Sequence, residues 1–154
     1  LLDRSTSETL SSINMIEGPV DTSRTMASLL FQGGAAKYPD IKWIFSHSGG
    51  VTPFLRSRFE RQMIDSKDSK EKMPNGLMHE LRKFYYDTAQ GNHEGALLAL
   101  LQIVPPSQVL YGTDFPFRDG AEVIGGLSKH GFSAADLKAI DRDNALRLMP
   151  RLKA

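Results

Sequence analysis

The chain has 154 residues, of which 40% are hydrophobic, and this is enough to bury one core and predicts a single compact unit over residues 1–154. Its 19 basic and 18 acidic side chains leave a net charge of +1, so composition provides no electrostatic surface for nucleic acid or an anionic membrane. The absence of cysteine excludes disulfides and thiolate ligands, so a bound metal would need imidazole and carboxylate groups.

The first half of the chain opens on Leu1, and its polar start through residue 12 leads us to expect a piece of a longer protein. A helix is predicted over Thr22 to Gln32, with Asp21 as its capping candidate. The apolar run Ile41 to Ser46 predicts a strand. The segment Asp65 to Gly76, dense in Lys, Asp and Ser, is typical of a solvated loop or insertion.

The second half repeats the alternation of strand and helix patterns. Strands are predicted over Phe84 to Thr88 and over Gln108 to Tyr111. Between them, Asn92 to Val104 carries a leucine stripe that predicts a helix ending at two prolines. Ser133 begins a capping-box-like pattern for a helix through Ile140, and Asp143 or Asn144 is a candidate cap for the last helix.

Strands that alternate with helices predict an α/β fold with a parallel sheet, as in a doubly wound sheet or an eight-stranded β/α barrel. Three strands are too few for a barrel, which needs eight strands and roughly 250 residues. We therefore expect the chain to form part of a barrel.

No membrane segment or secretory signal is visible. The longest apolar run, Ala96 to Leu101, is far shorter than the roughly 20 residues that span a bilayer. The N-terminus lacks the hydrophobic stretch of a signal peptide. We therefore expect a cytoplasmic protein.

His47 follows the first predicted strand and precedes Gly49 and Gly50. Ligands of parallel α/β folds bind at the carboxyl ends of the strands, and the glycines permit a sharp turn or a close approach to a substrate. His47 is therefore a candidate ligand or general acid–base. The alternative is a strand-end histidine that hydrogen-bonds a neighbour.

Asp114 follows the third predicted strand, in the sequence Tyr-Gly-Thr-Asp-Phe-Pro-Phe. Packing among these aromatic residues would desolvate the carboxylate, which would then need a partner, a hydrogen bond or a metal. The alternative is an Asp turn or helix cap before Pro116.

The other polar candidates have no ligand spacing. Asp87 and Thr88 end the middle strand, but a structural role is the favoured interpretation of both. His79, His93 and His130 lie in helical or loop surroundings, and we expect surface or capping roles for them.

Taken together, these motifs resemble the amidohydrolase-related family that includes aminocarboxymuconate semialdehyde, resorcylate and 6-methylsalicylate decarboxylases. The resemblance runs from about Asp21 to the C-terminus. The matching segments, in order, are Tyr38-Pro39-Asp40-Ile41-Lys42, His47-Ser48-Gly49-Gly50 with Pro53-Phe54-Leu55, Phe84 to Thr88, Leu110 to Phe117, and Asn144-Ala145.

The resemblance implies the C-terminal portion of a (β/α)8 barrel, with strands about six to eight. It places His47 after strand six as an acid–base or substrate contact, and Asp114 after strand eight as ligand to one divalent metal, zinc or, alternatively, manganese. The family's other ligands, a His-x-His or Glu-x-His pair and a further His, are missing here, so we expect them upstream of Leu1. Because a catalytic zinc takes three protein ligands, we predict that this chain alone is metal-poor and inactive.

For the complete enzyme, the resemblance implies non-oxidative decarboxylation of a small aromatic or unsaturated carboxylic acid resembling 6-methylsalicylate. The metal would orient the substrate, and Asp114, or His47 assisted by it, would protonate the ring carbon. Two alternatives stay open: a metal-dependent hydrolase of the same superfamily, and an inactive truncated half-barrel.

Arg58 lies eleven residues after His47, where an arginine of the resembling decarboxylases reaches the active site of the neighbouring subunit. This implies a homodimer in which Arg58 binds the substrate carboxylate. The alternative, a solvated arginine on a helix face, is somewhat favoured by the neighbouring Arg56 and Arg61.

Overall fold

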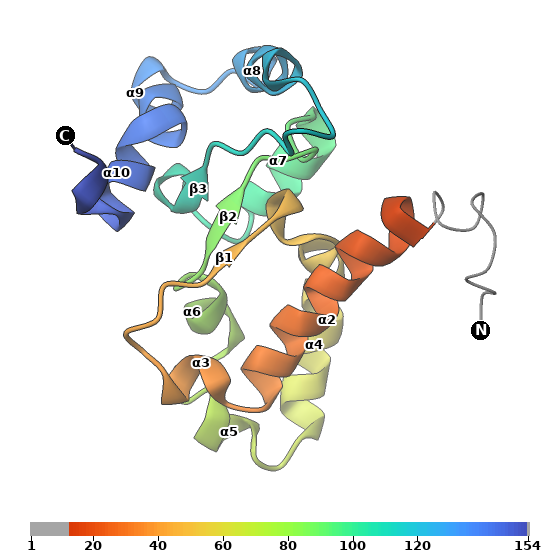
Figure 1. Ribbon diagram of the computed structural model, residues 1–154. Coiled ribbons are helices and arrows are strands. Elements are labelled where there is room, and N and C mark those ends of the chain that lie inside the picture. Colours follow the sequence, from red (N-terminus) through yellow and green to blue (C-terminus); the bar gives the residue numbers. More distant parts are fainter. Residues whose placement is uncertain (1–12, 154) are drawn as a thin grey trace.

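The computed structural model describes residues 13–153, in which three short parallel strands are surrounded by helices (Figure 1). The strands are β1 (Ile44–Phe45), β2 (Tyr85–Asp87) and β3 (Val109–Leu110). The helices are α2 (Gly18–Phe31), α3 (Gly34–Lys37), α4 (Thr52–Asp65), α5 (Ser69–Lys72), α6 (Leu77–Leu81), α7 (Glu94–Leu101), α8 (Gly120–Lys129), α9 (Ala134–Lys138) and α10 (Asn144–Leu148). Short π or 3-10 turns cover Ile13–Glu17, His47–Gly49, Pro106–Gln108, Ala139–Asp143 and Pro150–Leu152.

The strands pair in the order β1-β2-β3, and both pairs are parallel, which confirms the predicted α/β class. Each strand lies inside its predicted range but is shorter. In register, Phe45 lies beside Tyr86 and Tyr86 beside Val109, so these three side chains share one face, and all three are buried. On the opposite face Ile44 is exposed.

The helices pack against the buried face of the sheet and form one apolar core with it. Phe45 contacts Phe84 edge to face, with ring centroids 5.0 Å apart. The long helices α2 and α4 lie side by side (Figure 1). Their contact includes Phe31 and Phe59, whose ring centroids are 5.9 Å apart. The wider core draws on every strand and on most helices; among its members are Met26, Leu30, Leu81, Leu97, Leu100, Val123, Leu127 and Ile140.

The first helix differs from its prediction at its N-terminus. The helix α2 begins at Gly18 because Pro19, with its fixed backbone angle, is favoured in a first turn. Asp21 therefore lies inside the first turn, where it pairs with Arg24, and the predicted cap at Asp21 is wrong.

The segment Asp65 to Gly76 was predicted as a solvated loop, and this is only partly correct. It contains the short helix α5, whose Lys72 Nζ pairs at 2.5 Å with Oδ2 of Asp68, the residue before the helix. Ser69 and Met73 are buried. Tertiary packing of these two residues therefore orders a stretch whose composition is that of a loop.

Two helix starts follow the chemistry of their caps. At α9, Ser133 Oγ accepts the backbone N–H of Asp136 at 3.1 Å, which confirms that the helix starts at a Ser133 cap. At α7, His93 Nδ1 accepts the backbone N–H of Ala96 at 3.3 Å, so His93 is a capping residue as expected. Within residues 13–153, none of the helices combines the length and the apolar character that a membrane crossing needs.

Candidate active site

The three parallel strands all point their carboxyl ends at the same edge of the sheet, and the polar residues of the sequence motifs follow them there. His47 follows β1, Asp87 ends β2, and Asp114 lies four residues after β3. In parallel α/β folds this edge carries the active site. The fold thus brings together residues that are far apart in the sequence.

His47 and Asp114 face each other across this edge. The distance from His47 Nε2 to Asp114 Oδ1 is 3.7 Å, which suits an ion pair when the imidazole is protonated. The side chains are 31% and 16% exposed, respectively, so both remain open to a small molecule. The structure therefore places the two predicted site residues in one cluster.

The backbone at this edge is strained. Within the described part of the chain, the non-glycine residues with positive φ are His47 (56°), Ser48 (55°), Gln90 (48°) and Asp114 (63°). Each such residue costs of order 1–3 kcal/mol, and such costs cluster at functional sites. All four lie in the loops that follow the three strands.

Asp87 uses its carboxylate on the backbone of two loops. Its Oδ1 accepts the N–H of His47 at 2.9 Å and the N–H of Ala89 at 3.0 Å. Burial raises the pKa of Asp87, and the two N–H donors lower it in part. Thr88 makes a similar link to the loop after β3, which is the third of the strand-end loops. Its Oγ1 accepts the N–H of Gly112 at 3.1 Å and donates to the carbonyl of Gly112 at 3.2 Å.

Gln90 is a site residue that the sequence did not reveal. Its Nε2 donates a short hydrogen bond to Asp114 Oδ2. Gln90 carries no motif, and its partner lies 24 residues away in the sequence. The only available signal was its place in the loop after the middle strand.

A cleft of about 350 Å³ opens beside His47, within the range of about 300–1,000 Å³ that is typical of small-molecule sites. It lies between the first turns of α2, α4 and α7, and Asp114 is not among its lining residues. The exposed ring of Phe54 forms one wall. The other lining residues are Met15, Pro19, His47, Ser48, Gly50, Val51, Pro53, Gln90, Gly91, His93, Ala96 and Ala99.

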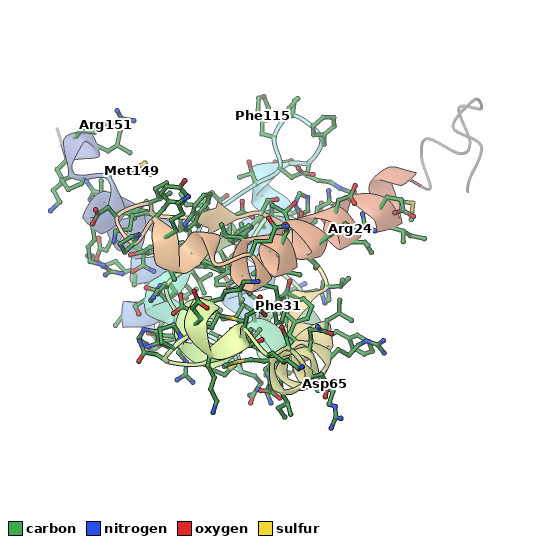
Figure 2. The ribbon with its side chains drawn as sticks, turned by 90° about the horizontal axis from the view of Figure 1, so that it is seen from below. Arg24, Phe31, Asp65, Phe115, Met149 and Arg151 are labelled. Carbon is green, nitrogen blue, oxygen red and sulfur yellow. The ribbon has the colours of Figure 1, made fainter. Side chains whose placement is uncertain are left out.

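The aromatic surroundings expected for Asp114 are absent. Phe115 and Phe117 are 81% and 82% exposed, and Phe115 projects on a loop away from the body of the chain (Figure 2). The prediction that these rings desolvate the carboxylate is therefore wrong for the described structure. Asp114 is instead hydrogen-bonded by Gln90 and faces His47.

Arg58 lies outside this cluster. It is exposed on α4 and lines a separate groove against α2, together with Phe31 and Gln62. Within one chain the structure does not bring Arg58 to the cleft beside His47. Its predicted contact with a neighbouring subunit stays a prediction.

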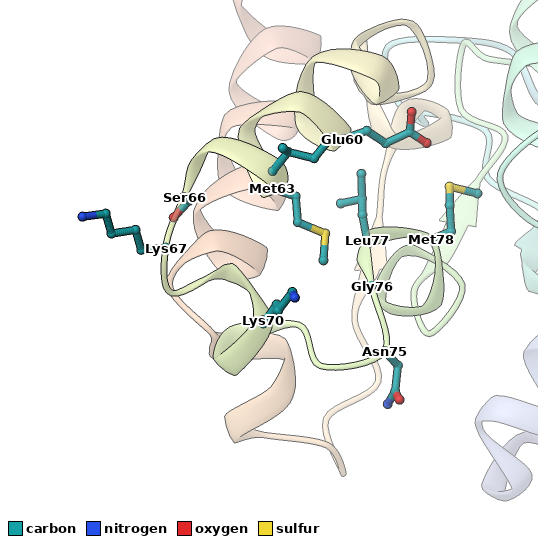
Figure 3. A pocket seen from close by; sticks show the side chains of 10 residues that line it. Glu60, Met63, Ser66, Lys67, Lys70, Asn75, Gly76, Leu77 and Met78 are labelled. Carbon is teal, nitrogen blue, oxygen red and sulfur yellow. The ribbon is translucent and has the colours of Figure 1, made fainter.

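A hollow of about 800 Å³, larger than the cleft beside His47, lies elsewhere, between the end of α4, α5 and α6 (Figure 3). Met63 and Leu77 line it, and Lys67 points away from it (Figure 3). It shares no lining residue with the cleft beside His47. Size alone therefore does not identify the active site.

The donor atoms of the edge would suit only part of a metal site. Within residues 13–153, no three His, Asp or Glu side chains are grouped so that they could hold a metal ion. Asp114 and His47 supply one carboxylate and one imidazole, whereas a catalytic zinc has three protein ligands. The described residues therefore do not complete a metal site by themselves.

Comparison with known proteins supports the same portion of a barrel. The chain is 32% identical over 148 residues to a decarboxylase of Aspergillus niger, covering 90% of this chain and 39% of the relative. It is 31% identical over 142 residues to the 6-methylsalicylic acid decarboxylase of Penicillium expansum, covering 90% and 44%. The chain thus spans about two fifths of the length of these curated relatives.

Among solved structures, the 5-carboxyvanillate decarboxylase of Novosphingobium aromaticivorans, complexed with manganese and 4-hydroxy-3-methoxy-5-nitrobenzoic acid, superposes with a TM-score of 0.73. The identity is 21%, and the match covers 84% of this chain and 38% of that chain. The fold is the C-terminal portion of a (β/α)8 barrel, as expected from the sequence. The model of the amidohydrolase family matches residues 15–151, and the chain therefore belongs to that family.

Proposed function

We propose that the whole protein containing these residues decarboxylates a small aromatic or unsaturated carboxylic acid without oxidation, and that 6-methylsalicylate represents its substrate class. The observation that carries the proposal is the pair of His47 Nε2 and Asp114 Oδ1, 3.7 Å apart at the carboxyl edge of the sheet. The relatives that are at least 30% identical and bear the name decarboxylase support the choice of reaction.

The reaction requires one proton at a defined carbon atom. The bond between the ring carbon and the carboxylate carbon breaks, its electron pair stays on the ring carbon, and carbon dioxide leaves. The ring carbon takes a proton in its place. Imidazole is the most common group for such a transfer, and the carboxylate of Asp114 beside His47 stabilises the imidazolium before the transfer. Substrate binding in the cleft beside His47 would hold the ring within reach.

We further propose that one divalent metal, manganese or zinc, is held by Asp114 and by ligands from barrel strands that these 154 residues do not include. Manganese is present in the related 5-carboxyvanillate decarboxylase. When bound, the metal would supply a template for the substrate carboxylate and withdraw negative charge from it. Asp114 would offer one carboxylate oxygen to the metal, while a hydrogen bond from Gln90 to Oδ2 holds the carboxylate in place.

The test is carbon dioxide release by the whole protein, loaded with manganese or zinc, from 6-methylsalicylate and related aromatic acids. His47→Asn and Asp114→Asn are each expected to lower kcat/KM by at least about 100-fold, the usual contribution of a general acid. The matched controls are His79→Asn and Asp40→Asn, which change exposed residues away from the edge and should retain activity. Failure to release carbon dioxide from any of these acids, with hydrolysis of an ester or amide in its place, would move the function to a hydrolase.

Arg58 extends the proposal to a homodimer, in which it would bind the substrate carboxylate in the partner's site. Arg58→Ala is expected to raise KM about tenfold, equivalent to roughly 1.4 kcal/mol of binding, with a smaller change in kcat. The control is Arg61→Ala, which removes an exposed arginine of the same helix that pairs with Asp65 at 2.9 Å. An unchanged KM, or a monomer in sedimentation experiments, would remove this role.

A further inference from the structure

We infer that the loop after β2 holds the two candidate catalytic residues in place, with Asp87 as positioning residue for His47 and Gln90 as positioning residue for Asp114. This inference rests on the proposed function of His47 and Asp114. It adds two residues for which the sequence showed no catalytic pattern. Both belong to one five-residue segment, Asp87 to Gly91, that begins with the last residue of the middle strand and continues into the loop after it.

The link to His47 is made through the backbone. Asp87 Oδ1 accepts the N–H of His47 at 2.9 Å while His47 and Ser48 are both in the left-handed region. That conformation is unfavourable for residues with a side chain, so a directional bond is needed to hold it. The same oxygen accepts the N–H of Ala89, which ties the turn of β1 to the loop of β2.

The loop also packs directly against the turn that carries His47. A Cβ atom at Gly91 would lie 2.1 Å from Ser48 Oγ, so only glycine lets the two segments approach this closely. Ser48 Oγ lies 3.4 Å from the carbonyl oxygen of Asp87 and 3.5 Å from that of Gly91. The loop therefore fixes His47 in two ways, through the backbone N–H of His47 and through its packing against Ser48.

The link to Asp114 is made through the side chain. Thr88 first fixes the third loop at Gly112 by two hydrogen bonds. Gln90 then donates its amide N–H to Asp114 Oδ2, which leaves Oδ1 facing His47 at 3.7 Å. A neutral amide suits this task, because it orients the carboxylate without cancelling its charge.

One loop thus sets both partners of the His47–Asp114 pair relative to each other. The two residues come from different strand ends, and β2 lies between those strands. A shift of the loop would change the distance between the imidazole and the carboxylate. Asp87 therefore acts on the reaction through His47. Gln90 also lines the cleft beside His47, and its positioning role is exerted through Asp114.

The test for Gln90, made in the whole protein, separates the effect of its side chain from the effect of its left-handed backbone. Gln90→Gly relieves a left-handed residue, so the melting temperature should stay the same or rise. The same variant should lose about 10–100-fold in manganese affinity, measured by calorimetry on metal-free protein, and a similar factor in kcat, with KM changed less. Gln90→Asn, which tolerates the left-handed backbone but is too short to reach Asp114, should behave alike. Gln102→Asn, a change at an exposed residue directly after α7, is the matched control.

The test for Asp87 uses a conservative rescue. Asp87→Ala should lower kcat and manganese affinity, because the N–H groups of His47 and Ala89 lose their acceptor. Asp87→Asn keeps an oxygen at that position and should restore most of both quantities. If Asp87→Ala fails to fold, the comparison of Asp87→Asn with Asp87→Leu, which has the size but no acceptor, takes its place.

The outcomes separate this inference from the proposed function. If Asp114→Asn retains metal affinity and activity, the proposed function is wrong and the positioning roles fall with it. If Asp114→Asn abolishes both while Gln90→Gly and Asp87→Ala or Asp87→Leu leave them unchanged, the proposed function stands and the positioning roles are wrong. Loss of function in Gln90→Gly without loss of thermal stability supports the positioning role, since a merely structural role would lower stability.

Discussion

Tyr86 and Asp87 are consecutive residues of β2, yet they belong to two regions that are held together in different ways. Tyr86 lies in the buried layer between sheet and helices, beside Phe45 and Val109. Asp87 belongs to the strand-end edge, where left-handed residues are tied by directional hydrogen bonds. The layer is apolar and regular, whereas the edge is polar and strained.

This difference indicates where stability and function reside. Burial of apolar area is non-directional, so the layer contributes free energy without fixing the position of any one polar atom. At the edge the strained backbone costs free energy, and a few hydrogen bonds with defined geometry offset part of this cost. Changes in the layer should therefore lower stability and leave the His47–Asp114 pair intact, and changes at the edge should do the reverse.

The largest effect on stability is expected from Phe84, which is fully buried and packs against Phe45. Phe84→Ala should lower the free energy of unfolding by about 3–5 kcal/mol, because it removes apolar contacts and leaves a cavity. Phe84→Leu, which keeps most of the volume, should cost less than Phe84→Ala. Urea unfolding of the whole protein measures both. A large fall in kcat/KM of the folded Phe84→Ala fraction would contradict the separation of layer and edge.

A smaller effect is expected from Asn144, a buried polar residue that has a structural task. Its Nδ2 donates to the carbonyls of Pro106 at 2.8 Å and Val109 at 2.7 Å, which fastens α10 to β3. Asn144→Ala should lower the free energy of unfolding by about 1–3 kcal/mol, because it leaves carbonyl groups without a donor. Asn144→Asp, which also lacks the donor, should be no more stable than Asn144→Ala. Wild-type stability of Asn144→Asp would show that these two bonds contribute little.

Much of the fold could be predicted from the sequence, because the relevant signals are local. The three strands are short apolar runs between breakers. The hydrogen bond by which Ser133 caps α9 joins residues only three positions apart in the sequence. The predictions failed where another local rule or a distant contact decided the outcome. Pro19 moved the start of α2 ahead of Asp21, and burial of Met73 ordered a segment with the composition of a loop.

The candidate site could be predicted in its residues but not in its geometry. The positions of His47 and Asp114 after strands indicated their common edge, and the structure places them 3.7 Å apart. The outward direction of Phe115 and the contact between Gln90 and Asp114 depend on loop conformations that no periodicity encodes. Positive φ at non-glycine residues leaves no mark in the sequence, since the usual sign of such a turn is glycine itself.

The smallest effects concern the pH dependence of stability. Asp87 at the edge and Asp68 near an outer helix should change the stability with pH in opposite directions. Burial raises the pKa of Asp87 above its ordinary value of 3.8. Between 3.8 and the raised value, the folded protein holds a proton that the unfolded chain has lost, so stability falls as pH rises through this window. Asp87→Asn should remove this fall. Thermal unfolding of the metal-free whole protein as a function of pH measures it.

Asp68, an exposed residue directly before α5, should show the reverse. Hydrogen bonds from Lys72 and then Ser66 lower its pKa from 3.8 to about 2, so its contribution is complete above 3.8 and is lost as pH falls towards 2. Because Asp68 is exposed, its contribution should be small, should shrink in high salt and should vanish in Asp68→Asn. The slope from Asp87 arises from burial and should persist in the same salt. Equal salt sensitivity of the two slopes would mean that the edge is hydrated like the outer surface, and the contrast between the two regions would fail there.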